Sequence, residues 1–440
     1  MSDKAAKTTK NDVAWETLFD RHNILDRVST DGVACISATQ INKVREARLM
    51  AKFDQSTLLP KMFRKNKLSI LPVSKGDYLI GPFATHEKIE YRTNVVPRQV
   101  KPPQLETLDA KNLYSEATAL LFAYHSGIIG NIMDCEPDEV KLTVNGRMAS
   151  GTFSFFIDNK VNPRSPIAVE VNNSQIEIDA GFESPNAFMV CEAKNQAPEE
   201  LLIRQLYYPY RLWKHKLGNR KDSKPVIPVF LAFSNDIFHA FIYEFEEYQD
   251  YNSIRLKTYK MYKFADEDVS LQDITELYLS VTVLPEPHTT FPQADSFPRV
   301  LDLLSVLHEG DLTRNGVTLK YQCAPRQTNY YIAACEYLGL IERSTIENSK
   351  RVYRLTPESR NIMSLPYKEK HLALIKKILE RRIFNEAYSI FLKSNRFPND
   401  NEICEIMRSA NLTINDTTIG RRVSTVRGWL NWILQIAVTD

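Results

Sequence analysis

The sequence predicts an α/β (α+β) protein with a mixed-sheet core, a basic N-terminal region and helical modules toward the C-terminus. Its 440 residues are enough for two or three domains of about 150 residues each. With 43% hydrophobic and 25% charged residues, its composition is that of a folded globular chain. Apolar residues alternate with polar ones in some segments and recur at helical spacing in others, so strands and helices are both expected.

The elements of the core follow in a definite order. Residues 113–133 have apolar positions at helical spacing, and four strand-like segments come next. Pro198 is expected to begin a helix with acids in its first turn. The resulting order is α-β-β-β-β-α-β, which predicts an α/β sandwich with one strand pair running parallel through a crossover helix. The strand-like segments are 138–148, 151–157, 167–182 and 187–193, with a last buried-type strand at 226–233.

Charge and proline divide the chain. Between Gln40 and Ser69 there are eight basic and two acidic residues, whereas 236–295 holds twelve acidic and four basic ones. Three prolines in 95–103 predict an extended linker and a boundary near residue 105. The expected regions are a basic N-terminal region (1–104), the core (105–250), an acidic connector (251–295), a compact helical unit with a hairpin (296–362) and a helical C-terminal module (363–440).

Several classes of protein are disfavoured. The six cysteines are scattered without a CxxC pair, which argues against a disulfide framework or a zinc finger and favours a reducing, cytosolic setting. The polar N-terminus and the lack of an apolar run of about 20 residues argue against secretion and membrane insertion. No GxxxxGK[ST], HExxH or GxSxG motif occurs, so P-loop, metalloprotease and serine-hydrolase chemistry are not supported.

Acidic and basic side chains gather on two strands of the core. Side chains alternate between the faces of a strand, so Glu192 and Lys194 share one face. If the preceding strand pairs with theirs across a short turn, Asp179 meets them at one end of the sheet. Two carboxylates beside an ammonium can hold Mg²⁺, which takes its other ligands from water and phosphate. Such a site suits hydrolysis of a phosphodiester bond.

The motif Asp179-(12 residues)-Glu192-Ala193-Lys194 resembles that of the PD-(D/E)xK nuclease superfamily, and the order of elements is similar to the core of that superfamily. Ile178 stands where the motif has proline. The resemblance implies that Asp179 and Glu192 bind Mg²⁺ and that Lys194 is the catalytic lysine. It also implies an acid from the preceding helix, here Glu116. Two side chains on the following helix, Gln205 and Tyr208, are expected to support the site, and Glu170, Glu177 and Glu183 compete as a fourth ligand.

Residues 297–356 resemble a winged helix, with three helical segments followed by a hairpin. In such folds the third helix enters the major groove of DNA and the hairpin meets phosphates. Contact with other proteins, or dimerisation, is the alternative use of this fold. The side chains expected to contact base edges are Arg326, Gln327, Asn329 and Tyr330. Those expected to contact phosphates are Lys350 and Arg351.

A second basic helix is expected near the C-terminus, in residues 417–433. Arg421, Arg422 and Arg427 recur there at near-helical spacing. This segment also resembles the recognition segment of a helix-turn-helix, although an ordinary solvated face has the same pattern.

A nuclease core joined to sequence-reading modules resembles a type II restriction endonuclease. The resemblance implies Mg²⁺-dependent hydrolysis of both strands of double-stranded DNA at a short sequence. A two-fold homodimer would supply one site for each strand, and a cognate DNA methyltransferase would be the functional partner. The basic residues 43–67 would contact phosphates. Two alternatives stay open, namely a non-catalytic winged-helix DNA-binding regulator and a repair or structure-specific nuclease.

Overall fold

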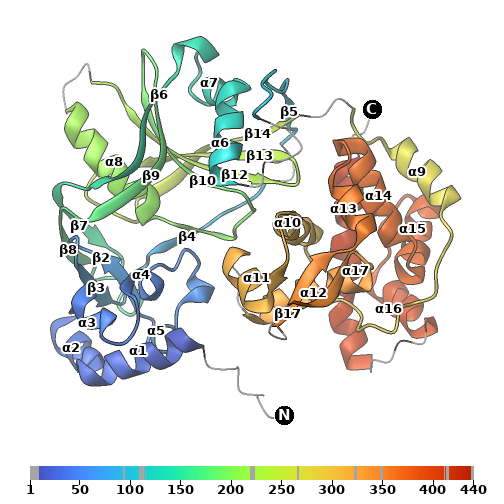
Figure 1. The fold of residues 1–440 in the computed structure, drawn as a ribbon, viewed down its shortest axis with the longest axis horizontal. Helices are drawn as coiled ribbons and strands as arrows, with labels where there is room; N and C mark the ends of the chain where they lie inside the picture. The colour runs from blue at the N-terminus through green and yellow to red at the C-terminus, as the bar shows by residue number, and fades with distance from the viewer. Residues whose placement is uncertain are drawn as a thin grey trace.

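The computed structural model describes residues 9–92, 95–108, 113, 115–218, 223–264, 267–321, 325–346, 350–410, 412 and 416–437. The chain is a mixed α/β protein with a large mixed sheet and many helices (Figure 1). Three parts are distinguished below: the N-terminal module (9–80), the central domain (81–264) and the C-terminal domain (267–437).

The N-terminal module folds around a small aromatic core. Trp15 packs edge-on against Phe63, with ring centroids 4.7 Å apart, and neither side chain is exposed. A three-stranded antiparallel sheet in the order β1-β3-β2 closes this core. Its elements are α1 (Lys10–Arg21), α2 (Ile24–Asp31), β1 (Ala34–Ser37), α3 (Ala38–Asn42), α4 (Ala47–Met50), the 3-10 helix η1 (Ser56–Leu58), α5 (Lys61–Lys65), β2 (Ser69–Pro72) and β3 (Asp77–Gly81).

A seven-stranded mixed sheet forms the central domain, in the order β5-β14-β13-β12-β10-β9-β6. Strands β10 and β12 are parallel and are joined through helix α8, which confirms the expected crossover. Helix α8 packs on one face of the sheet, and α6 and α7 on the other. The bounds are β5 (Arg98–Gln99), α6 (Glu116–His125), α7 (Ile128–Ile132), η2 (Pro137–Glu139), β6 (Lys141–Ala149), β9 (Gln175–Glu183), β10 (Phe188–Lys194), α8 (Arg204–Leu217), β12 (Val226–Ser234), β13 (Ile237–Phe245) and β14 (Ile254–Lys263).

Two segments of this domain that were each expected to form one element form two. The helix expected over 113–133 is divided into α6 and α7 at Gly127, whose φ of 78° no helix accommodates. The segment 167–182 forms two strands, because Asn173 turns the chain with φ 52°. Strand β8 (Ile167–Asn172) therefore pairs with β7 (Thr152–Ile157) in a separate hairpin.

The helix expected to begin at Pro198 begins only at Arg204. Residues Glu200–Leu202 form the short strand β11, because β4 (His86–Lys88) offers them an antiparallel partner. This long-range pairing outweighs the local signal for a helix start.

Strand pairing also relocates the boundaries of the central domain. Strands β4 and β5 belong with it, so residues 81–104 join the central domain and not the basic region. Strand β14 is an inner strand of the sheet, so residues 251–264 are not part of a connector.

Residues 297–355 of the C-terminal domain follow the element order of a winged helix. Helix, short strand, two helices and a hairpin follow one another, and the strands pair in the order β15-β17-β16. These elements are α10 (Phe297–His308), β15 (Leu312–Thr313), α11 (Arg314–Lys320), α12 (Pro325–Tyr337), β16 (Ile341–Ile346) and β17 (Lys350–Leu355).

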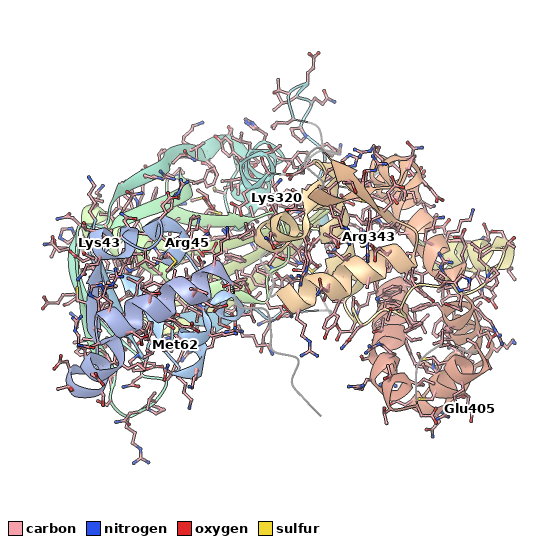
Figure 2. The ribbon with its side chains drawn as sticks, turned by 60° about the horizontal axis from the view of Figure 1, so that its bottom comes forward. Lys43, Arg45, Met62, Lys320, Arg343 and Glu405 are labelled. Carbon is pink, nitrogen blue, oxygen red and sulfur yellow. The ribbon has the colours of Figure 1, made fainter. Side chains whose placement is uncertain are left out.

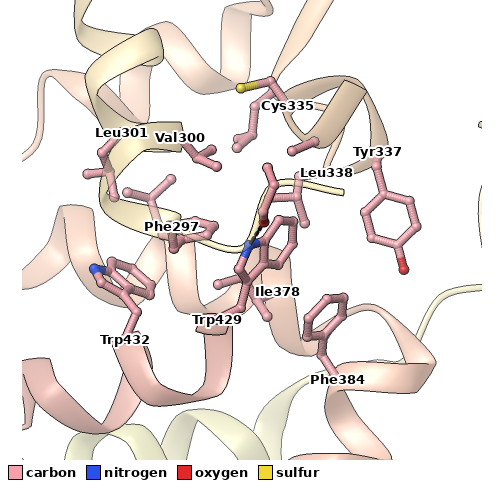
Figure 3. Close-up of a cluster of buried hydrophobic side chains, with 14 of the residues drawn as sticks. Phe297, Val300, Leu301, Cys335, Tyr337, Leu338, Ile378, Phe384, Trp429 and Trp432 are labelled. Carbon is pink, nitrogen blue, oxygen red and sulfur yellow. Dashed lines mark hydrogen bonds between the residues drawn. The ribbon is translucent and has the colours of Figure 1, made fainter. Parts of the chain in front are cut away.

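The regions 296–362 and 363–440 share one hydrophobic core and form one body (Figure 3). Trp429 is fully buried between Phe297 and Phe384, and its Nε1 donates a hydrogen bond to the carbonyl oxygen of Ala294 at 2.7 Å. The remaining helices are α9 (Leu271–Ser280), α13 (Pro357–Met363), α14 (Tyr367–Leu379), α15 (Arg382–Ser394), α16 (Asp400–Ser409) and α17 (Asp416–Ile436). Across the described ranges, no helix is both long and apolar enough to cross a membrane.

Candidate active site

Asp179 is fixed where strands β9 and β10 separate. The two strands pair as far as Ala180 and Cys191. Beyond that point, the carboxylate of Asp179 accepts a hydrogen bond from the backbone N–H of Ala193 at 2.8 Å. The Asp179 carboxylate thus bonds the Ala193 N–H, which is no longer paired between β9 and β10, and this hydrogen bond fixes the orientation of the side chain.

Glu192 and Lys194 form a buried ion pair at the end of β10. Their exposed fractions are 5% and 6%. Lys194 Nζ donates to Glu192 Oε1 at 2.6 Å and to the carbonyl oxygen of Ala193 at 3.2 Å. Gln205, in the first turn of α8, also donates to Glu192 Oε1. Glu116 begins α6, and its Oε1 lies 3.5 Å from Lys194 Nζ. Side chains from β9, β10, α6 and α8 therefore lie close together at the C-terminal end of β10.

Negative charge exceeds positive charge at this point. Burial raises the pKa of Glu192 to about 8. The positive charge of Lys194 lowers this pKa and Asp179 raises it, but burial has the largest effect. Burial likewise raises the pKa of Glu116. Burial alone would lower the pKa of Lys194, but the surrounding carboxylates raise it instead, so the ammonium stays charged. Glu192 consequently retains a proton at neutral pH, which a bound cation would displace.

The donor set fits a hard divalent cation. The oxygens of Asp179, Glu192, Glu116 and the Ala193 carbonyl are of the kind that Mg²⁺ prefers. Within the described part of the chain, no group of three or more His, Cys, Asp or Glu side chains is placed so that it could hold a metal ion. Mg²⁺ does not need a group of that size, because it keeps several waters and is held by one or two carboxylates and phosphate oxygens.

Tyr208 does not reach the site. Gln205 points toward Glu192, but the hydroxyl of Tyr208 donates to the carbonyl oxygen of Pro72 at 3.1 Å. Its ring packs edge-on against Phe153 of β7, with centroids 5.3 Å apart. The expectation that Tyr208 supports the site is therefore wrong, because this position on α8 faces the apolar core.

The competing acids also lie elsewhere. Glu177 pairs with Arg147 at 3.3 Å, and Glu183 pairs with Lys224 at 2.6 Å. Glu170 is exposed on β8, in the separate hairpin. None of the three joins Lys194, so the fourth acid of the site is not among them.

Asp54 is the site-proximal residue that the sequence did not reveal. It belongs to the N-terminal module, yet its charge acts on Glu116, Glu192 and Lys194. In the sequence it is one of only two acids among eight basic residues between Gln40 and Ser69. An acid within a basic segment was the only sequence feature that could have pointed to Asp54.

The expected DNA-contacting side chains of α12 lie at its N-terminal end. Arg326 and Asn329 are exposed, and Gln327 and Tyr330 are half-buried. Arg326 donates to the hydroxyl of Tyr330, and Arg314 Nε donates to Asn329 Oδ1 at 2.7 Å. These bonds hold the side chains in place in the absence of a ligand.

Two further basic positions were expected on the wing of this fold. Arg351 on β17 is exposed. The side chain of Lys350 lies outside the described residues.

The N-terminal half of α17 comes close to α12. Arg421 is exposed, and half-buried Arg422 lies near both Arg421 and Tyr330. Arg427 instead pairs with Asp400 of α16. The basic side chains of α17 therefore adjoin α12 through Arg422.

Basic side chains are also exposed on the N-terminal module. Figure 2 shows Lys43 and Arg45 on this module, and Lys320 of α11 and Arg343 of β16 in the C-terminal domain. The exposed basic side chains of residues 43–67 are Lys43, Arg48, Lys52, Arg64, Lys65 and Lys67.

The C-terminal domain is bonded directly to the loop that follows Lys194. Buried Asp302 of α10 accepts hydrogen bonds from the N–H of Ala197 at 3.3 Å and from Ser234 Oγ at 2.6 Å. Lys370 pairs with Asp236 at 2.5 Å across the same boundary.

Asp302 should make stability depend on pH. Burial raises its pKa from 3.8 to about 6. Between these values the unfolded chain loses its proton while the folded chain keeps it, so the free energy of unfolding falls as pH rises, by roughly 3 kcal/mol in total. We expect Asp302→Asn to remove this dependence in urea unfolding between pH 4 and 6.5. The same change at exposed Asp295 is the control, and an equal effect of both would contradict the assignment.

Three family models match the chain, each described as a domain of unknown function. They cover residues 12–80 (DUF6996), 81–263 (DUF6997) and 299–438 (DUF7226). The first two limits coincide closely with the N-terminal module and the central domain, whereas the third model begins within α10 and leaves out residues 267–298 of the C-terminal domain. No curated protein and no solved structure matches the chain.

Proposed function

We propose that the chain is a Mg²⁺-dependent nuclease of the PD-(D/E)xK kind, and specifically a type II restriction endonuclease that cuts double-stranded DNA at a short sequence. The observation that carries the proposal is the meeting of Asp179, Glu192 and Lys194 at the end of β10. Glu116 and Gln205 adjoin the same point from the two flanking helices. A site with several carboxylates and one ammonium is suited to reactions on a phosphate group.

Asp179, Glu192 and Glu116 would hold the cation in this mechanism. When bound, Mg²⁺ would neutralise charge on the scissile phosphate and lower the pKa of a water molecule. Gln205 keeps the carboxylate of Glu192 in position through its hydrogen bond. Lys194 stays charged and can orient the attacking water, while the N–H of Ala193 fixes Asp179.

The C-terminal domain would select the DNA sequence. Arginine can bind guanine, and asparagine or glutamine adenine, through paired hydrogen bonds to base edges. Arg326, Gln327 and Asn329 stand at the N-terminal end of α12, where a winged helix reads the major groove. The basic side chains of residues 43–67 and of α17 would contact phosphates, so binding should weaken as salt increases.

Restriction would also define the partners. One such site cuts one strand, so a two-fold homodimer is the simplest assembly that cuts both. A cognate DNA methyltransferase would protect the host genome, and the protein would act in the prokaryotic cytoplasm. The scattered spacing of the cysteines agrees with that location.

Incubation of the full chain with plasmid DNA tests this proposal. We expect discrete fragments with Mg²⁺ and none after EDTA is added in excess. Sequencing of the fragment ends would then give the recognised site and the stagger together. Nicks confined to branched or damaged DNA would instead indicate a repair or structure-specific nuclease.

The strand order β15-β17-β16 supports a second candidate, a non-catalytic DNA-binding regulator. In that case the winged helix carries the function and the central domain senses a ligand or assembles the protein. Sequence-specific binding in a mobility-shift assay, without cleavage under any Mg²⁺ concentration, would favour the regulator.

A further inference from the structure

We propose that Asp302 and Arg299, both on α10 of the C-terminal domain, are positioning residues of the candidate site. They would hold the loop that follows Lys194, residues 195–199, in the place that cleavage needs. This inference rests on the proposed function, since it concerns the same reaction. The C-terminal domain would then act on the cleavage rate and not only on the choice of DNA.

Asp302 joins the ends of strands β10 and β12. These strands run parallel, and Lys194 and Ala232 are their last pair. Beyond that pair, the N–H of Ala197 donates to Asp302 Oδ2 at 3.3 Å, and Ser234 Oγ donates to Asp302 Oδ1 at 2.6 Å. One carboxylate from another domain therefore bridges the two strands where they separate, directly after Lys194.

The bridge is buried and needs a carboxylate. Asp302 and Ser234 are each 3% exposed. A carboxylate can accept on both oxygens, one for each strand, whereas an amide has a single acceptor oxygen. Burial raises the pKa of Asp302 to about 6, so holding the charged form at neutral pH lowers the free energy of unfolding. A group that costs stability is explained more readily by a part in positioning than by a part in folding.

Arg299 connects the same loop with the winged helix. It precedes Asp302 by three residues, so the two side chains lie on one face of α10. Its Nη1 atom lies 3.8 Å from Glu199 Oε1. The guanidinium carbon lies 4.7 Å from the ring centroid of Tyr321 and 5.7 Å from that of Tyr331, which belongs to α12. One face of α10 therefore contacts both the loop and the proposed recognition helix.

The central domain holds the far end of the loop. The hydroxyl of Tyr91 donates to the carbonyl oxygen of Pro198 at 3.0 Å, and the N–H of Ile89 donates to that of Glu199 at 2.9 Å. Ala197, between these anchors and Lys194, is held by α10. Misplacement of a reacting group by about 1 Å can lower a rate on the order of 10²-fold, so release of Ala197 should be visible in the cleavage rate.

The single-turnover cleavage rate and the DNA affinity in EDTA, measured on the same variants of the full chain, test this inference. We expect Asp302→Asn to lower the rate on the order of 10- to 100-fold, because the amide cannot accept from both Ala197 and Ser234. The dissociation constant for DNA should not change. Arg299→Gln should act in the same direction, and Arg299→Lys, which keeps the charge beside Glu199, should retain more of the rate.

Lys370→Gln is the matched control. Lys370 pairs with Asp236 across the same domain boundary, in the turn between β12 and β13. The change removes an ion pair between the domains but leaves the bonds of Ala197 and Glu199 in place. This variant should therefore cut as fast as wild type.

The outcomes separate this inference from the proposed function. If wild type does not cut, the proposed function is wrong and the inference falls with it. If wild type cuts and the Asp302 and Arg299 variants cut equally fast, only the inference is wrong. DNA affinity that falls as much as the rate would assign the two residues to DNA binding. Rates that follow the melting temperature in every variant, Lys370→Gln included, would indicate a structural role. Either of these last two results overturns the inference.

Discussion

Lys194→Ala should abolish most DNA cleavage while the protein still folds. Loss of a group that orients the attacking water typically lowers a rate on the order of 10²- to 10⁴-fold. The buried neighbour Glu192 would lose its counter-charge, but its raised pKa of about 8 lets it take up a proton at neutral pH. The plasmid assay under single-turnover conditions measures the rate, and thermal melting confirms the fold.

Lys224→Ala is the matched control for this variant. Lys224 forms a 2.6 Å ion pair with Glu183 of the same sheet, but both side chains are partly exposed. Its loss should change cleavage little. If the Lys194 variant cuts as fast as wild type, or if both variants lose activity equally, Lys194 has no special part in the reaction.

Arg326→Ala should weaken binding to the recognised sequence far more than binding to unrelated DNA. A paired hydrogen-bond contact with a base is worth about 1–3 kcal/mol, which corresponds to roughly 5- to 150-fold in the dissociation constant. Arg326 is exposed at the start of α12 and contacts only Tyr330 there in the described structure. Titrations of cognate and scrambled duplexes at one salt concentration give the two affinities.

Arg343→Ala provides the comparison within the same winged helix. Arg343 is also exposed, but both arms of its guanidinium are bonded to Glu336, at 2.5 and 2.8 Å. We expect this variant to bind both duplexes as wild type does. A uniform loss for Arg326→Ala on both duplexes would assign this residue to phosphate contact and not to base recognition.

The central part of the candidate site could be predicted because local rules determine it. Alternation along a strand places Glu192 and Lys194 on one face, and the short turn before β10 brings Asp179 beside them. The first turn of α6 presents Glu116 for the same kind of reason, since the helix start at Ser115 is locally capped. Each of these placements depends on residues close in the chain.

The remaining features depend on contacts that no local pattern contains. The strand β11 exists because β4, more than 100 residues earlier, pairs with it, and so the helix start at Pro198 was wrong. Tyr208 lies on the same helix as Gln205, but the β7–β8 hairpin covers it. Asp54 comes from another module altogether, where its neighbours are basic.

The hydrogen bond between Asp302 and Ala197 limits how such a protein could be re-engineered. Exchanging the C-terminal domain for one of different specificity would remove the acceptor of the Ala197 N–H and of Ser234. Ala197 is only three residues beyond Lys194, so the exchange would disturb the candidate site as well as the C-terminal domain. A chimera would need an acid at the position that Asp302 has in α10, and designs that treat the two domains as independent of each other should fail.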